Sequence, residues 1–158
     1  MSKSEIKFLM KDKNQIRIIN KKASYNYELI ESFTAGICLK GTEIKSIKES
    51  NVSFNNGFCF FKKNEIFIKG LHISEYLYGN TNNHDPMRDK KLLLNKNEIN
   101  KLKKNLEEKN MSIIPKKLFI NNKGLAKIEI SLAKGKKLVD KRESIKKKDI
   151  ERKLKQNY

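Results

Sequence analysis

The segment IIPKKLFINNKGLAKIEISL, residues 113–132, is the part of the chain that decides the fold. Residues 118–120 are apolar, residues 121–124 are turn-forming Asn, Lys and Gly, and residues 126–132 alternate strictly. In that last stretch the even-numbered residues are apolar and the odd-numbered ones are polar, which is the pattern of a half-buried strand. The segment therefore predicts a β-hairpin that closes a small sheet.

Three upstream segments carry the same kind of signal. Residues 15–20, 28–39 and 58–68 are rich in Ile, Leu and Phe and are expected to be extended. Inside the third segment, Lys63-Asn64 predicts a two-residue hairpin link. Inside the second, Gly36 predicts a bulge or a tight bend, as at the corner of a barrel.

Turns and one helix separate these strands. The alternation of residues 42–47 predicts a further strand, and the Asn-Asn-Gly sequence of residues 55–57 predicts a turn. Residues 79–86 form the most turn-rich stretch of the chain. Asn95 followed by Glu98 is a capping box, and the apolar residues after it recur at a spacing of three or four, which predicts a helix.

Six or so short strands with one clear helix among them predict a mainly β protein with flanking α-helices, built as an OB-like antiparallel barrel. A length of 158 residues fits one domain with appendages. We divide the chain into a flexible N-terminal arm (1–14), a barrel (15–133) and a basic C-terminal tail (134–158).

The chain carries 36 Lys and Arg against 18 Asp and Glu, a formal net charge of +18. Residues 134–158 hold 11 basic and 4 acidic residues, a charge of +7, and residues 1–133 hold 25 and 14, a charge of +11. The tail has too few apolar residues to offset the entropy lost on ordering, so we expect it to be disordered when free. It also lacks the wide apolar face that a lipid surface requires, so nucleic acid is the expected partner.

The remaining composition narrows the class of protein. No apolar run approaches the ~18 residues that span a bilayer, and no secretory signal is visible, which predicts a cytoplasmic protein without a membrane partner. Cys38 and Cys59 match neither a disulfide framework nor a metal motif, and we expect both to be reduced thiols in the core. No cofactor is expected, and a free monomer is the default.

Groups suited to catalysis are sparse. His72 and His84 have no acidic or Cys partner at ligand spacing, so each is expected to be a structural or RNA-contacting histidine rather than a metal ligand or a base. Asp85 and Asp89 could share a metal, but a turn residue and a helix-start acid are the simpler interpretation. We therefore expect no enzyme.

Two basic stretches suit RNA binding. Residues 20–27, NKKASYNY, interleave cations, amides and aromatic rings, a combination that can bind phosphate and stack a base. An ordinary basic loop with two tyrosines anchored in the core fits that stretch equally well. Arg88, Lys90 and Lys91 precede three leucines, residues 92–94, for which the alternative is a helical turn with solvated lysines.

Four motifs also occur in order along the chain. They are Asn20-Lys21-Lys22-Ala23, then Ala35-Gly36-Ile37-x-Leu39-x-Gly41-Thr42-Glu43-Ile44-Lys45-Ser46, then Asp85-Pro86-x-Arg88-x-Lys90-Lys91-Leu92-Leu93-Leu94, and finally Ala133-Lys134-Gly135-Lys136-Lys137-x-x-Asp140-Lys141-Arg142-Glu143. Together they resemble the SsrA-binding protein family, also called small protein B, the bacterial partners of transfer-messenger RNA (tmRNA). The resemblance runs from about residue 15 to the end of the chain, with near-matching spacings.

This resemblance implies a six-stranded OB-type barrel that binds the tRNA-like domain of tmRNA (SsrA RNA), chiefly at its elbow and D-loop. It implies that the tail enters the empty mRNA channel of a stalled ribosome and folds there as a helix near the decoding site of the small subunit. A tagging message is then translated, which rescues the ribosome by trans-translation. The protein itself catalyses nothing.

The resemblance also implies site residues. The RNA-contacting positions of the barrel are Asn20, Lys21, Lys22, Leu93 and Lys127, with Arg88 and Lys91 in support and Thr34 where some members carry a Glu. The ribosome-contacting positions of the tail are Lys134, Gly135, Lys136, Lys137, Asp140, Lys141 and Arg142. Two further positions depart from the family: Lys90 replaces a usual Arg and loses its bidentate fork, and Val139 replaces a His or aromatic residue that can stack.

Two other interpretations stay open from the residues. A ribosomal protein or a general RNA chaperone with a similar barrel would share the charge and the strands. An RNA-processing enzyme would need a paired acidic or histidine site, which the sequence does not supply.

Overall fold

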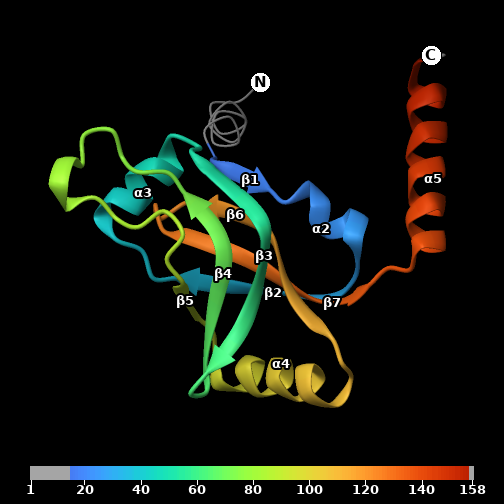
Figure 1. The fold of residues 1–158 in the computed structure, drawn as a ribbon, viewed down its shortest axis with the longest axis horizontal. Coiled ribbons are helices and arrows are strands. Elements are labelled where there is room, and N and C mark those ends of the chain that lie inside the picture. Colours follow the sequence, from blue (N-terminus) through green and yellow to red (C-terminus); the bar gives the residue numbers. More distant parts are fainter. Residues whose placement is uncertain (1–14, 157–158) are drawn as a thin grey trace, which may run out of the picture.

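The chain forms one antiparallel sheet of seven strands in a computed structural model that describes residues 15–156 (Figure 1). The strand order is β1-β6-β3-β4-β5-β2-β7, and β6 also pairs with β7, so six strands close into a barrel and β1 extends it beyond β6. The predicted six-stranded barrel is therefore confirmed. The strands are β1 (Arg17–Ile19), β2 (Tyr27–Ile37), β3 (Val52–Lys62), β4 (Glu65–Ile73), β5 (Lys90–Leu93), β6 (Ser112–Ile120) and β7 (Ala126–Gly135).

Within the described residues, four α-helices and one 3-10 turn flank the barrel. They are α2 (Lys21–Asn26), α3 (Gly41–Lys48), α4 (Lys96–Glu108), α5 (Leu138–Gln156) and η1 (Asn80–Asn82). The expected N-terminal arm, residues 1–14, lies outside the described residues, as do the side chains of residues 138–140. Between residues 15 and 156, no helix is long and apolar enough to cross a membrane.

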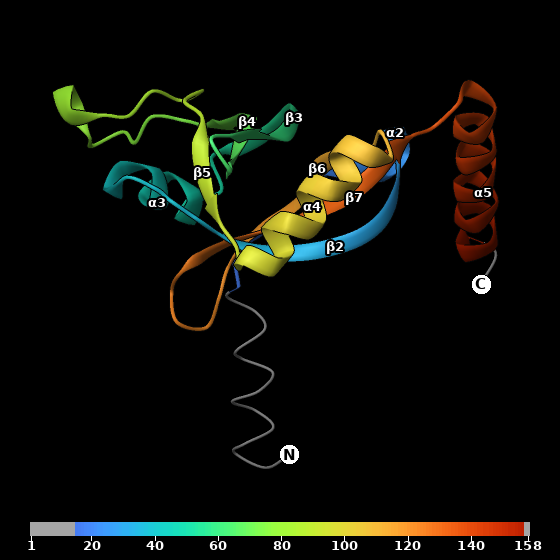
Figure 2. The ribbon, with the colours of Figure 1, turned by 90° about the horizontal axis from the view of Figure 1, so that it is seen from below.

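Helix α4 begins as predicted and α5 stands clear of the barrel. The carboxylate of Glu98 accepts a hydrogen bond of 3.0 Å from the Asn95 amide, which satisfies one of the free donors at the helix start. Leu102 is fully buried, so α4 packs its apolar face on the barrel. Figures 1 and 2 both show α5 outside the barrel, beyond the end of β7.

Both predicted hairpins form. Lys62 pairs with Glu65, and the linking residues Lys63 and Asn64 have φ values of 49° and 62°, the left-handed pair that a two-residue type I′ turn requires. Strands β6 and β7 are joined by residues 121–125, and their pairing runs back from there to Ser112 and Ala133 with one register shift between Pro115 and Lys117.

The strand alternation builds the core. On β7, Ile128, Ile130 and Leu132 are buried as predicted, whereas Lys127 and Glu129 are only half-buried. Each fully buried aliphatic side chain contributes about 1.5–3 kcal/mol relative to an exposed one. These inward-facing side chains make up the core, which lies inside the closed barrel. Its other members buried to 2% exposure or less are Ala35, Ile47, Ile66, Ile68, Leu71, Ile73, Leu92, Leu102, Ile113 and Leu118.

The strand predicted at residues 42–47 is wrong, because this segment is helix α3. The side chain of Glu43 accepts a hydrogen bond of 2.7 Å from the Lys40 amide, which caps the start of the helix. Ile44 and Ile47 are three residues apart, a spacing that also suits a helix, and Ile47 is fully buried. A short alternating run was ambiguous, and the cap decided it.

The turn predicted at residues 55–57 is also wrong, because these residues continue β3 through a register shift between Phe54 and Phe58. A Cβ on Gly57 would lie 2.9 Å from the Lys69 carbonyl oxygen, and Gly70 opposite has a φ of +83°. The two glycines therefore let β3 and β4 approach closely at this bulge.

The bulge predicted at Gly36 falls elsewhere on β2, between Leu29 and Glu31. Gly36 instead lies where β2 pairs on one side with Leu93 of β5 and on the other with Lys127 of β7. Gly36 therefore matters because it lets the neighbouring strands approach β2 closely, and it does not interrupt the strand register.

Three smaller expectations also fail. Residues 90–93 form β5, so the alternative of a helical turn and the assignment of Asp89 as a helix-start acid are both wrong. Cys59 is buried as expected, and burial raises the pKa of its thiol well above the usual value. Cys38 is exposed instead of lying in the core.

Candidate nucleic-acid interface

The closure of the barrel brings together three site residues that are far apart in sequence. Leu93 and Lys127 flank Gly36 on neighbouring strands, and exposed Thr34 lies two residues before it on β2. Residues 36 and 34 of a strand project to the same face, so Thr34 belongs to the same outer surface. We call the residues Thr34, Gly36, Leu93 and Lys127 the closure surface.

The closure surface contains a hollow of about 290 Å³. Its walls are apolar and open to solvent, since they include the side chains of Leu93, which is 52% exposed, and Leu125, which is 54% exposed. Lys127 is the one cation in the lining. A Cβ on Gly36 would lie 3.3 Å from the Leu93 Cβ, so the glycine keeps this floor open. An apolar wall beside a single ammonium group can contact the face of a base and a phosphate together.

Two lysines that the sequence did not single out border the closure surface. Lys116 and Lys117 bind opposite oxygens of Glu129 at 2.8 and 2.9 Å, and Glu129 pairs with Thr34 across β2 and β7. Hydrogen bonding from Lys116, followed by that from Lys117, holds the pKa of Glu129 below its usual value against the opposing effect of burial. Glu129 thus supplies a carboxylate next to Thr34.

The segment 20–22 is fixed to the barrel by its backbone and by Asn20. The Asn20 side-chain amide donates to the Pro115 carbonyl at 2.9 Å, and its backbone amide donates to the Lys116 carbonyl at 2.8 Å. Helix α2 follows, with Ala23 buried against Ile114. Lys21 and Lys22 are exposed. The structure thus presents both cations on a short helix rather than on a loop.

The cations of residues 88–91 have partners within the fold. The guanidinium of Arg88 makes a two-point contact with the fully buried Glu43, at 2.8 Å from Nε to Oε1 and 2.6 Å from one terminal nitrogen to Oε2. Burial alone would raise the pKa of Glu43, but the hydrogen bonds from Arg88 and the Lys40 amide outweigh it, and the pKa lies below its usual value. Arg88 therefore ties the loop before β5 to α3.

Lys90 is fully buried, and its ammonium group donates to the carbonyl oxygens of Leu71 and Arg88, both at 2.9 Å. Burial lowers the pKa of Lys90, against the opposing charge of Glu43. Lys91 points outward instead and pairs with Glu65 at 2.5 Å. Position 90, where the resemblance expects an Arg, therefore lies inside the fold and not on the closure surface.

The tail residues divide between strand and helix. Lys134 and Gly135 belong to β7, so the last strand runs two residues past the predicted end of the barrel. Lys136 donates to the Ser24 carbonyl at 2.9 Å and to the Ser144 hydroxyl at 3.1 Å, which links the start of α5 to α2. The side chains of Val139 and Asp140 lie outside the description. Of the other predicted tail positions, Lys137 and Arg142 are exposed and Lys141 is half-buried.

His84 and Asp85 have structural roles in the residues that are described. His84 is buried, its Nε2 bonds the Ile73 carbonyl and its Nδ1 bonds the Thr42 hydroxyl, both at 2.9 Å. Asp85 caps a turn by accepting from the Met87 amide, as expected of a turn residue. Among the side chains that the structure describes, no group of three His, Cys, Asp or Glu residues is arranged to hold a metal ion.

Comparison with known proteins adds the family. The sequence profile of the family described as SmpB protein matches residues 17–158. An SsrA-binding protein of Bacteroides thetaiotaomicron is 52% identical over 137 residues, which cover 87% of this chain and 91% of that protein. One of Cytophaga hutchinsonii is 53% identical over 139 residues, which cover 88% and 91%.

A solved structure agrees with these relatives. It is described as "tmRNA-SmpB: a journey to the center of the bacterial ribosome", has a TM-score of 0.67 and is 39% identical, covering 78% of this chain and 86% of its own. The chain therefore belongs to the SmpB family of SsrA-binding proteins.

Proposed function

We propose that this protein is an RNA-binding adaptor that binds the tRNA-like domain of tmRNA and delivers it to stalled ribosomes, where trans-translation tags the peptide and rescues the ribosome. Its family membership and its similarity to a tmRNA-SmpB structure support this function. It is an adaptor and not an enzyme. Its partners are tmRNA and the decoding site and mRNA channel of the small ribosomal subunit, and it acts in the cytoplasm.

The observation that carries this proposal is the closure surface. Leu93 contacts a base or sugar through its exposed side chain, and Lys127 binds an adjoining phosphate. Thr34 offers a hydroxyl to RNA beside Glu129, whose two carboxylate oxygens are bound by Lys116 and Lys117. The cations of Lys21 and Lys22 extend this surface past β6, and Lys91 borders it on β5.

The tail acts on the ribosome. Apart from half-buried Ser144, the residues of α5 from Arg142 to Gln156 are exposed, and so are its apolar residues Ile145, Ile150 and Leu154. Pairs such as Glu143 with Lys147 stabilise a helix by only about 0.2–0.5 kcal/mol each, too little to hold it in isolation. The rRNA-lined channel supplies the missing free energy by counterion release.

A titration of tmRNA with closure-surface variants tests the binding role. Lys127→Ala and Leu93→Asp should each lower the affinity of the full chain for tmRNA about tenfold or more, which is ~1.4 kcal/mol. Lys62→Ala, an exposed lysine at the β3–β4 hairpin, should change it less than about twofold. Equal effects of all three would mean that the closure surface does not bind the RNA.

The same titration separates the alternative of a ribosomal protein or general RNA chaperone. An excess of bulk tRNA should displace little tmRNA from this protein, because the proposed site binds tmRNA selectively. From a general chaperone, tRNA would displace tmRNA in proportion to the tRNA concentration.

A further inference from the structure

The seam between β3 and β6 is the least-paired place in the barrel. In the described residues these neighbouring strands share one registered pair, Cys59 with Ile113. Next to it, β3 bulges at Asn56 and Gly57 to meet β4. The seam therefore stays partly open where the other strand pairs close the wall.

Two hollows open on this seam and join. One, of about 370 Å³, lies between α2, β6 and the start of α5, and the other, of about 250 Å³, lies between β3, β6 and α4. Both are lined by Tyr27, Asn56 and Ile114, so they are two ends of one groove. We call it the seam groove. The larger hollow is near the lower limit of small-ligand sites, about 300–1,000 Å³, so it suits a nucleotide and not a duplex.

One end of the seam groove is cationic. Lys22, Lys136 and Lys141 line it, and its lining includes no Asp or Glu. None of the three ammonium groups has a carboxylate within ion-pair distance among the side chains that the structure describes. The hydrogen bonds of Lys136 go to neutral oxygens of Ser24 and Ser144. Such a cluster suits a phosphate group.

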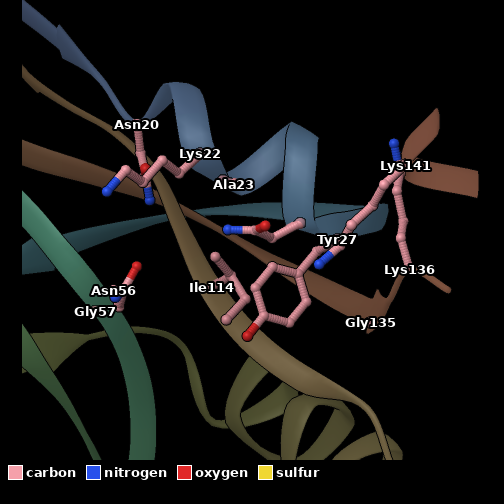
Figure 3. A pocket seen from close by; sticks show the side chains of 11 residues that line it. Asn20, Lys22, Ala23, Tyr27, Asn56, Gly57, Ile114, Gly135, Lys136 and Lys141 are labelled. Atoms are coloured by element: carbon pink, nitrogen blue, oxygen red, sulfur yellow. The ribbon is translucent and has the colours of Figure 1, made fainter. Parts of the chain in front are cut away.

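The rest of the groove presents rings and amides. Figure 3 shows Tyr27 beside Ile114, between Asn20 and Lys22 on one side and Lys136 and Lys141 on the other. Beyond Asn56 the groove reaches Phe58, which is 45% exposed and whose ring lies 6.3 Å from that of Phe60.

Two amides complete this chemistry. The side chains of Asn26 and Asn56 have no hydrogen-bond partner among the interactions of the described residues, so their donors and acceptors are available to a ligand. Aromatic faces, unoccupied amides and a cation cluster are the three groups that bind an unstacked nucleotide.

We propose that the seam groove binds a short unpaired segment of the RNA held on the closure surface, with a base against Tyr27 or Phe58 and a phosphate at Lys22, Lys136 and Lys141. The inference rests on the proposed function. Because Lys22 belongs to α2 and the other two cations to the tail, one bound nucleotide reinforces the link that Lys136 already makes between the tail and α2. RNA binding thereby fixes where α5 starts.

A matched pair of variants tests the groove. Asn56→Asp places a carboxylate in the lining, and Asn55→Asp adds the same charge one residue away, outside the lining. Both residues are exposed. In a titration of tmRNA with the full chain, Asn56→Asp should weaken binding about tenfold relative to Asn55→Asp, since a like charge faces the phosphate. Equal affinities would overturn the proposal.

A second pair covers the case in which Asn56→Asp alters the fold of β3. Lys141→Gln removes a groove cation and Lys147→Gln removes an exposed cation further along α5. The first should weaken tmRNA binding about threefold more than the second and lower the salt dependence more. Identical titrations for the two would count against the groove.

Photo-crosslinking of tmRNA substituted with 4-thiouridine locates the nucleotide. Crosslinked peptides should include residues 20–27 or 55–60, and crosslinks confined to peptides of residues 90–93 and 125–129 would exclude the groove. The proposed function fails separately: if the unaltered protein shows no preference for tmRNA over tRNA, the function is wrong, whereas loss of affinity in Lys127→Ala alone leaves the function and removes the groove.

Discussion

The two basic stretches at residues 20–22 and 88–91 look alike in sequence but have opposite roles. Lys21 and Lys22 are exposed at the start of α2. Arg88 is bound to the buried carboxylate of Glu43, and Lys90 is enclosed by backbone carbonyls. Lys21 and Lys22 therefore keep their charge for a partner, whereas Arg88 and Lys90 use theirs inside the fold.

Local geometry explains the difference. In β5 the side chains alternate, so Lys90 and Leu92 point into the barrel and are buried, while Lys91 and Leu93 point outward. A cation that a strand places inside must find oxygen atoms there, because burying an unpaired charge is costly. Residues in the first turn of a surface helix face no such constraint. Basic composition alone does not identify an RNA-binding residue.

The strongest test of this comparison is Arg88→Ala. Removing one partner of a buried ion pair typically costs 3–5 kcal/mol, here about that much, because the Glu43 carboxylate is left buried without its cation. Urea denaturation should show this loss in the free energy of unfolding. Adding Glu43→Gln to Arg88→Ala should recover part of it, since the orphaned charge is then gone. A full loss of tmRNA affinity with unchanged stability would instead return Arg88 to the RNA-binding residues.

The pH dependence of stability tests the same ion pair with Arg88 left in place, and the expected effect is smaller. Because the pKa of Glu43 is lower in the folded protein than its ordinary value of 4.5, the ionised carboxylate stabilises the fold above that pH. This contribution should disappear as the pH falls from 4.5 through the lower folded pKa. The difference in unfolding free energy between the unaltered protein and Glu43→Gln should therefore be constant near neutral pH and shrink in acid. A difference that stays constant down to about pH 3 would contradict the lowered pKa.

Sequence reasoning predicted the elements whose signals are local. The capping box at Asn95, the Lys63-Asn64 link and the alternation of β7 each contain their own cause within a few residues. The helix at residues 41–48 was missed because its short alternating run suits a strand as well as a helix; the cap of Glu43 on the Lys40 amide is local, and the contact of Arg88 with Glu43, 45 positions apart, adds to it.

The residues of the candidate site were likewise predictable only where their signal is local. Leu93 and Lys127 were assigned only through the resemblance, because nothing local shows that strand pairing sets both beside Gly36. Lys116 and Lys117 were missed for the same reason, since their partner Glu129 lies across a hairpin.

The exposed cations of residues 20–22 give the next prediction. Lys21→Ala with Lys22→Ala should leave the free energy of unfolding within about 0.5 kcal/mol, because surface substitutions away from special features have small effects. The slope of log affinity for tmRNA against log salt should become shallower by about one for each phosphate that the protein no longer neutralises. Filter-binding titrations at several salt concentrations measure it. If the slope were unchanged, Lys21 and Lys22 would be solvated cations without a phosphate partner.

Lys91 lies between the two cases and gives the smallest effect. It points outward with Leu93, but it is paired with Glu65, and both side chains are more than a third exposed, so the pair adds only about 0.2–1 kcal/mol to stability. If Lys91 binds phosphate, it must first leave Glu65, and Glu65→Gln should then raise tmRNA affinity up to a few-fold while barely changing stability. Glu75→Gln removes the same charge from an exposed loop residue and is the matched control. An equal gain in both variants would show that only the overall charge matters, and would place Lys91 with the residues whose charge is used within the fold.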